Sequence, residues 1–255
     1  MKTEIDLREM LEAGVHFGHK KDRWNPKMRP FIYTERNGVH IFDLTITKKQ
    51  LEEAMNFISK ITANHGTVLF VGTKNQVKEI VKNAAKEAGM PYLVDRWPGG
   101  MLTNFQTIVE RLKYLEEAEA KNKDEKSSLT KKEKLSLKRE LDKLKATFEG
   151  VAEMRKLPEA IFVSDICKER IAIKEAKKMG IPVIGIADTN ATPDIEYIIP
   201  GNDDAVKSVK YIVEKIAASV TAPKAVDTLD KTEAAETVKE EKSKKENKEE
   251  EKPKE

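Results

Sequence analysis

The chain has 255 residues, of which 39% are hydrophobic and 36% charged, and its formal net charge is +3. The hydrophobic fraction is enough for a folded core, while the single cysteine excludes an internal disulfide and a cysteine-based zinc cluster. No apolar run approaches the roughly 20 residues that span a bilayer, and the first residues lack the apolar centre of a signal peptide. We therefore expect a cytoplasmic protein.

A basic segment follows a short helix that is expected to be capped by Thr3 and to stop at Gly14. Residues 14–30, which we call the basic arm, show neither helical nor strand periodicity. Five cations surround Trp24 in this arm: Lys20, Lys21, Arg23, Lys27 and Arg29. Such spacing favours an RNA-binding surface, because phosphates can meet the charges while a base lies on the ring. An ordinary solvated loop with one packed Trp is the alternative.

The next elements complete an N-terminal region, residues 1–64. Asn37-Gly38 lies between two β-rich runs, which is the strongest short signal of a β-hairpin. An amphipathic helix follows, with Leu51 and Ile58 among its regularly spaced apolar residues. Because these elements belong to no βαβ unit, we expect the basic arm to lie across the edge of the main domain, attached to it by Trp24 or His19.

Short apolar runs alternating with helices dominate the rest of the chain. Runs at residues 68–71, 92–94, 160–163, 182–187 and 197–199 are typical of buried strands, and helices are expected at about 75–88, 169–179 and 203–220. This alternation predicts an α/β domain, a parallel sheet with helices on both faces, built from residues 65–104 and 152–220.

A helical insertion separates the two halves of this domain. Apolar residues recur at coiled-coil spacing in two arms, so residues 105–151 are expected to form an antiparallel coiled-coil hairpin, although two ordinary helices packed on the sheet are the alternative. Capping boxes begin both arms, at Thr103 and Thr130. Residues 221–255 consist largely of Lys and Glu and are expected to be a disordered tail.

The end of the first core strand offers the best candidate for an enzymatic site. Gly72-Thr-Lys-Asn75 carries a strand into a helix and resembles a phosphate cradle, but it lacks the glycine spacing of a dinucleotide or triphosphate site. We expect Lys74 to contact a nucleic-acid phosphate instead. A stand-alone α/β enzyme that binds a phosphorylated small molecule at Gly72–Lys74 is the alternative function.

Acidic residues gather after the last strands, where sites form in parallel sheets. Asp188, Asp204 and His19 are candidate ligands of a divalent ion, although turn chemistry at Asp188 and a helix cap at Asp204 are the stronger explanation of the aspartates. A second aromatic and cationic cluster, Arg96-Trp97 followed by two glycines, is either an RNA contact or a structural hinge between the sheet and the hairpin.

Several motifs resemble those of bacterial small-subunit ribosomal protein two. They occur in the family's order and span roughly residues 3–220: G-V-H-F-G-H with W-N-P-K-M-R-P, then F-V-G-T-K, R-W-x-G-G-M-L-T-N, I-P-V-I-G-I-A-D-T-N and I-P-G-N-D-D-A. Two positions depart from the family pattern, Pro98 for a more usual leucine and Ile166 for a proline. Neither departure removes a cation or a tryptophan of the motifs.

The resemblance implies a flavodoxin-like sheet with a projecting coiled-coil hairpin and no catalytic activity or required cofactor. It also implies a place at the junction of head and body of the small ribosomal subunit. The expected partners are small-subunit ribosomal RNA, neighbouring ribosomal proteins and, in bacteria that have it, ribosomal protein S-one. The predicted RNA-binding residues are Lys20, Lys21, Arg23, Trp24, Lys27, Arg29, Lys74, Arg96, Trp97 and Asn104.

Overall fold

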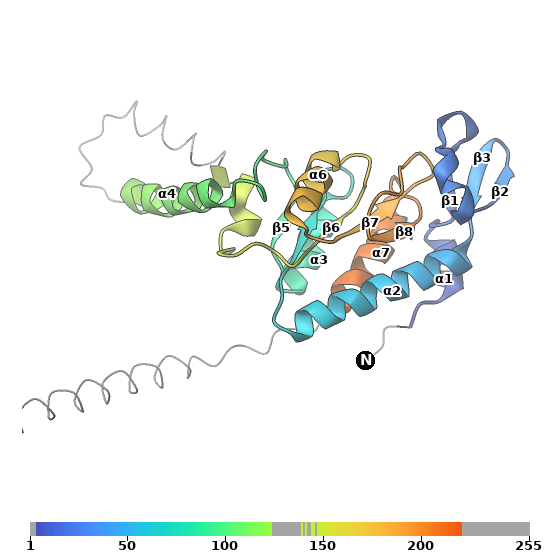
Figure 1. The fold of residues 1–255 in the computed structure, drawn as a ribbon, viewed down its shortest axis with the longest axis horizontal. Helices are drawn as coiled ribbons and strands as arrows, with labels where there is room; N and C mark the ends of the chain where they lie inside the picture. Colours follow the sequence, from blue (N-terminus) through green and yellow to red (C-terminus); the bar gives the residue numbers. More distant parts are fainter. Residues whose placement is uncertain (1–3, 124–138, 140, 142–143, 146, 221–255) are drawn as a thin grey trace, which may run out of the picture. The chain divides into compact units, whose positions relative to one another are not determined.

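A parallel five-stranded sheet forms the centre of the molecule (Figure 1). The computed structural model describes residues 4–123, 139, 141, 144–145 and 147–220. The strands are β4 (Val68–Val71), β5 (Tyr92–Leu93), β6 (Ala160–Val163), β7 (Val183–Ala187) and β8 (Tyr197–Pro200). Their spatial order, β5-β4-β6-β7-β8, is the flavodoxin-like order, and every pairing is parallel. The predicted α/β domain is confirmed.

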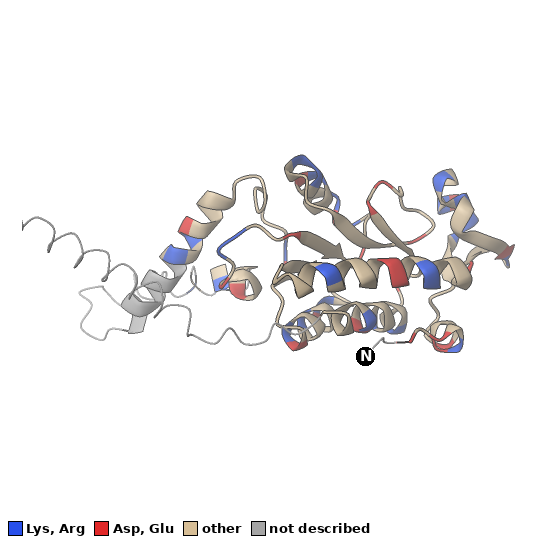
Figure 2. Cartoon of the chain, turned by 60° about the horizontal axis from the view of Figure 1, so that its bottom comes forward, with Lys and Arg blue, Asp and Glu red and all other residues tan. Residues whose placement is uncertain are grey.

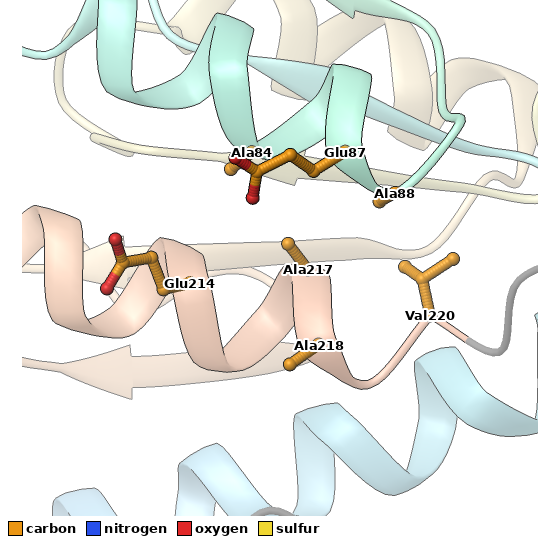
Figure 3. A pocket seen from close by; sticks show the side chains of 7 residues that line it. All are labelled: Ala84, Glu87, Ala88, Glu214, Ala217, Ala218 and Val220. Atoms are coloured by element: carbon orange, nitrogen blue, oxygen red, sulfur yellow. The ribbon is translucent and has the colours of Figure 1, made fainter.

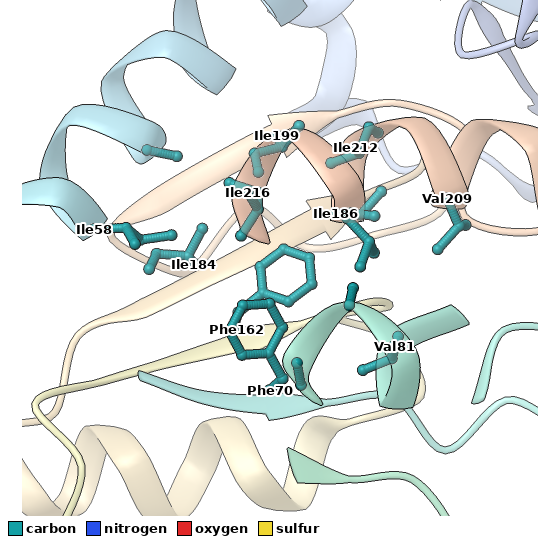
Figure 4. Packing of buried hydrophobic residues seen from close by; sticks show 14 of the residues in the cluster. Ile58, Phe70, Val81, Phe162, Ile184, Ile186, Ile199, Val209, Ile212 and Ile216 are labelled. Carbon is teal, nitrogen blue, oxygen red and sulfur yellow. The ribbon is translucent and has the colours of Figure 1, made fainter. Parts of the chain in front are cut away.

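Helices cover both faces of this sheet. One face packs against α2 (Leu44–Ala63), α3 (Lys78–Glu87) and α7 (Val206–Ala218). Phe70 and Phe162 meet in this layer with ring centroids 5.4 Å apart (Figure 4). The other face packs against α6 (Arg170–Met179) and the base of α4 (Phe105–Lys123). Every residue of β4, β6 and β7 is buried, which explains why these strands are continuous apolar runs.

The basic arm belongs to a second, antiparallel sheet. Its strands are β1 (Phe17–Lys20), β2 (Ile32–Arg36) and β3 (Val39–Phe42), in the order β1-β3-β2. Asn37 and Gly38 adopt positive φ values of 53° and 73° in the turn between β2 and β3, so the predicted hairpin is confirmed. Although the arm shows no periodicity in the sequence, it contains regular structure, because β1 pairs with β3 and is followed by the 3-10 helices η1 (Lys21–Arg23) and η2 (Pro26–Phe31).

The first helix is shorter than expected. It is α1 (Leu7–Glu12), and its cap is Asp6, whose carboxylate accepts a hydrogen bond from the Arg8 backbone N–H at 2.9 Å. The predicted cap, Thr3, lies outside the described residues. Lys215 of α7 contacts the Glu9 carboxylate at 3.4 Å, which ties the helix to the α/β domain.

The helical insertion is described in part. Its first arm is helical as α4, and its second arm ends in a helical segment and the 3-10 helix η3 (Glu149–Val151). Four predicted seam residues, Ile108, Leu112, Phe148 and Val151, are buried in the same apolar cluster as the sheet. The far end of the hairpin, including Thr130, and the tail 221–255 lie outside the described residues, so the coiled coil stays a prediction. In the part of the chain that is described, no helix has the length and apolarity needed to cross a membrane.

Candidate RNA-binding surface and the carboxyl edge of the sheet

The cations of the basic arm are all exposed (Figure 2). Lys21 pairs with Glu35 at 3.0 Å, an exposed contact of small energy. Trp24 is half-buried and packs on His40 of β3, with ring centroids 5.0 Å apart. The arm therefore presents its charges to solvent, while contact with His40 limits the exposed surface of the Trp24 ring.

Hydrogen bonds hold the basic arm at the carboxyl edge of the five-stranded sheet, where its strands end. The His19 backbone N–H donates to Asp188 Oδ1 at 3.1 Å and to Thr189 Oγ1 at 2.9 Å. Further along, the Asn25 N–H donates to the Thr189 carbonyl at 2.7 Å. A side chain at Gly18 would collide with Thr189, because a Cβ there would lie 2.5 Å from Thr189 Cγ2. The expectation that His19 attaches the arm to the domain is confirmed.

Lys74 lies in an acidic cluster at the same edge, where carboxylates surround its ammonium. The ammonium lies 2.7 Å from Asp165 Oδ2 and 2.9 Å from an oxygen of each of Asp203 and Asp204. An ammonium has three donors, and these carboxylates accept all of them. The lysine side chain is only 17% exposed, so it lies mostly inside the protein. Its three donors are all used by carboxylates, which leaves none free for phosphate.

The pKa values of Asp203 and Lys74 are both raised in this acidic cluster, but by different causes. Burial raises the pKa of Asp203 to about 7, and the charges of Asp165 and Asp188 add to this effect. Burial acts to lower the pKa of Lys74, but its hydrogen bonds and the aspartate charges outweigh burial and raise that pKa. The lysine is therefore a permanent cation that keeps several carboxylates together.

The three predicted metal ligands lie together as ion pairs. His19 Nδ1 is 3.0 Å from Asp188 Oδ2, and His19 Nε2 is 3.4 Å from Asp204 Oδ2. The hydrogen bond that the His19 ring donates to Asp188 raises the pKa of His19. The imidazole therefore lies between two carboxylates, and no group of three His, Cys, Asp or Glu in the described part of the chain has an arrangement suited to a metal ion. Metal binding by this set stays a prediction.

Replacing His19 with alanine is expected to loosen the basic arm without removing its cations. The side-chain contacts to Asp188 and Asp204 are lost, at a cost of about 1–3 kcal/mol, while the backbone bonds of residue 19 remain. Amide hydrogen exchange checks this result, with faster exchange expected in residues 17–25 and unchanged exchange in β6. Lys20→Ala, at an exposed neighbour, is the control; equal exchange in the two variants would contradict the role of His19.

Trp97 is packed inside the protein, as expected for a structural hinge, which is one of the two interpretations of its cluster. It is 7% exposed, and its indole N–H donates to Glu175 Oε1 of α6 at 3.1 Å. The same carboxylate accepts hydrogen bonds from the backbone N–H groups of Gly100, Leu102 and Thr103 and from the Thr103 hydroxyl, at 2.8–3.2 Å. The aromatic cluster is therefore the structural hinge that leads into α4.

Glu175 itself was missed by sequence reasoning. Its signal is an acidic residue among Ala172, Ile173 and Ala176 on the buried side of α6, a place where a carboxylate needs strong partners. Thr103 takes part in the hydrogen-bond network around Glu175, because its hydroxyl donates to the Glu175 carboxylate. The other two predicted contacts in the region, Arg96 and Asn104, are exposed and stay predictions.

A pocket between α3 and α7 offers no site for a phosphorylated molecule (Figure 3). Its volume is about 270 Å³, and its lining residues are Ala84, Glu87, Ala88, Glu214, Ala217, Ala218 and Val220. The only charged groups in this lining are carboxylates, which repel phosphate. The alternative site at Gly72–Lys74 does not suit a phosphorylated molecule either, since the ammonium of Lys74 is paired with aspartates.

Comparisons with known proteins agree with the sequence motifs and this fold. The family model described as ribosomal protein S2 matches residues 10–223. The chain is 51% identical over 217 residues to small ribosomal subunit protein uS2 of two Thermus thermophilus strains, which covers 84% of this chain and 85% of each relative. It is 48% identical over 223 residues to the protein of the same name from Thermobifida fusca, covering 86% of this chain and 76% of that relative. The chain therefore belongs to the ribosomal protein S2 family and is a structural, non-enzymatic protein of the small ribosomal subunit in the cytoplasm.

Proposed function

We propose that the chain binds small-subunit ribosomal RNA through the basic arm, at the junction of head and body of the subunit. The observation that carries this proposal is a set of five exposed cations on a segment that hydrogen bonds hold at the carboxyl edge. Phosphate contacts of this kind supply much of the affinity of proteins for nucleic acid. Family membership supports the proposed location.

The attachment of the basic arm matters for affinity. A free basic loop loses backbone freedom when it binds, which costs about 1–2 kcal/mol for each residue that is fixed. Here β1 pairs with β3, and the His19 and Asn25 backbone groups bond to residues at the carboxyl edge, so the backbone is ordered before RNA arrives. The protein thus presents a preformed row of charges.

Individual residues have different parts in this proposal. Lys20, Lys21, Arg23, Lys27 and Arg29 contact phosphate groups, while the exposed part of Trp24 packs on a ribose or a base edge. Arg96 and Asn104 supply further contacts on the surface near the hairpin. Lys74 and Trp97 have no part in RNA binding, because their polar groups are used inside the protein.

Changing Lys20, Lys21 and Arg23 to alanine together is expected to weaken binding to small-subunit RNA. Each lost phosphate contact lowers the slope of log affinity against log salt by about 0.7–0.9, so the slope falls by roughly two to three. Lys21 contributes least, since Glu35 already holds its ammonium. Filter binding at several salt concentrations measures the effect.

The control for the arm variant removes the same charge elsewhere. Lys60 of α2 and Lys207 and Lys210 of α7 are exposed on helices that cover one face of the five-stranded sheet. Their triple alanine variant has the same net charge as the arm variant. Equal slopes for the arm variant and the native chain would show that the arm does not bind phosphate.

We further propose that this chain contacts neighbouring small-subunit proteins and helps to recruit ribosomal protein S-one where an organism has it. Membership of the family supports both parts of this proposal. Co-sedimentation of the purified chain with small subunits tests the first part. Comparing the S-one content of small subunits that carry or lack the chain tests the second.

A further inference from the structure

The outer face of α6 is strongly basic. Its exposed positions hold Arg170, Lys174, Lys177 and Lys178, which lie on one side of the helix together with Ile171, 60% exposed. Lys168, just before the helix, is also exposed. The two acidic residues near these cations, Glu169 and Glu175, are buried and hydrogen-bonded to Thr73 and to the Trp97–Thr103 segment, respectively.

This face differs in charge from the helices on the other side of the sheet. On α3, Lys82 and Lys86 both contact Glu149, and Lys78 contacts Asp95. On α7, Lys210 pairs with Glu214 and Lys215 with Glu9. By contrast, Lys168, Lys174 and Lys178 have no carboxylate within 4.0 Å among the residues that the structure describes. The exposed face of α6 therefore carries excess positive charge, whereas these lysines of α3 and α7 are compensated.

The basic face of α6 lies close to the basic arm. Lys177 contacts Asp194 at 2.5 Å, in the loop between β7 and β8. The hydrogen bond from Lys177 lowers the pKa of that aspartate, and the positive charges of Lys177 and Lys27 add to this effect. The arm is bonded to the same loop, because the Asn25 side chain donates to Thr192 Oγ1 at 3.1 Å. Arm and helix thus flank one loop, and the cations of both are exposed; Figure 2 colours the lysines and arginines of both segments blue.

The chemistry of the face suits the RNA backbone. Its exposed residues are long cations and two apolar side chains, Ile171 and Met179, with no aromatic ring on which an unpaired base could stack. Cations at positions 170, 174 and 178 recur about once per turn, so they form a row along the helix about 12 Å long. A row of point charges without stacking groups binds phosphates in a helical RNA segment and does not read bases.

We propose that α6 is a second RNA-binding element, whose outer face contacts the phosphates of a helical segment of small-subunit ribosomal RNA and extends the surface of the basic arm across the β7–β8 loop. This inference rests on the proposed RNA-binding function of the arm. Asp194 lies between the two basic surfaces and weakens their attraction for phosphate. Lys174 and Lys178 are the principal contacts, because no carboxylate compensates them.

The test compares three variants of the full chain in one RNA-binding assay. Lys174→Ala with Lys178→Ala is expected to lower the salt slope by about 1.4–1.8. Asp194→Asn is expected to raise affinity and steepen the slope, because it removes a negative charge and frees Lys177. Lys60→Ala with Lys210→Ala, on α2 and α7, changes net charge as the first variant does and is expected to leave binding nearly unchanged. All of these side chains are exposed, so thermal unfolding should verify an intact fold in each variant.

The outcomes separate this inference from the arm's function. If the α6 double variant binds RNA like the Lys60 and Lys210 control, or Asp194→Asn gives no gain, α6 is not an RNA-binding element, and the basic face then fits an acidic protein instead. The arm variant of Lys20, Lys21 and Arg23, measured in parallel, would in that case still lose affinity. If neither the arm variant nor the α6 variant differs from the native chain, the proposed function of the arm fails as well.

Discussion

Replacing Lys74 with methionine is expected to lower the free energy of unfolding by about 3–5 kcal/mol at pH 8. Methionine keeps much of the side-chain volume but removes the ammonium that Asp165, Asp203 and Asp204 share. Asp165 and Asp203 are buried, so they would be left as uncompensated charges in the interior. Urea unfolding followed by circular dichroism measures the loss, and Lys207→Met, an exposed lysine of α7, is the control.

The effect of Lys74→Met should depend on pH. Asp203 already has a pKa of about 7, above its value in an unfolded chain, and removing the lysine raises it further. A carboxyl with a raised folded-state pKa contributes stability below its unfolded pKa and loses that contribution as pH rises through the folded value. The variant is therefore expected to lose less stability at pH 5 than at pH 8. An equal loss at both pH values would mean that charge repulsion is not the cause.

Replacing Glu175 with glutamine is expected to destabilise the protein by about 2–3 kcal/mol and to loosen the start of α4. The amide has one oxygen acceptor where the carboxylate has two, and five donor groups converge on that carboxylate. The new NH₂ group would also face the backbone donors of Leu102 and Thr103. Hydrogen exchange at residues 100–108 measures the loosening, with Glu214→Gln on the exposed side of α7 as the control.

The contribution of Glu175 should disappear in acid. Burial acts to raise the pKa of this carboxyl, but the hydrogen bonds from Leu102, Gly100, Trp97 and Thr103 outweigh burial and lower it. Its stabilising effect is therefore present above the unfolded pKa and is lost as pH falls through the folded value. The difference in stability between the native chain and the variant is expected to shrink below about pH 4. A difference that persists at pH 3 would show that charge is not what matters at this position.

The sheet was predictable because its signals are local. Four-residue apolar runs such as Val68–Val71 are buried on both faces, and their composition alone indicates this. The Asn37-Gly38 turn was predictable for a similar reason, since positive φ values restrict the residues that a type I′ turn accepts. The helices at the base of the helical hairpin were predictable from the spacing of their apolar residues. Strand β1 was not predictable, because its four residues are only partly buried or exposed and it pairs with a distant strand.

The site was less predictable, because exposure depends on distant residues. Lys74 and Asp203 are 129 positions apart, and no local pattern shows that their side chains meet. Trp97 has an RNA-like neighbourhood in sequence, but Glu175, 78 positions away, takes its indole N–H. Cations on the arm were identified correctly as exposed, since no apolar stripe accompanies them. The basic face of α6 was missed because its sequence contains two glutamates, and only the fold shows that both are buried.

The position of Lys74 has a consequence for what this fold can do. In flavodoxin-like sheets the crevice beyond the carboxyl ends of the strands is where a diffusible ligand binds. In this protein, that crevice already contains a covalently attached cation from the loop after β4 and an imidazole from β1. Side chains of the protein itself, Lys74 and His19, therefore occupy the place where a ligand would bind. The ion pairs at this edge fasten the arm by contacts of the kind that a ligand makes in other sheets of this type.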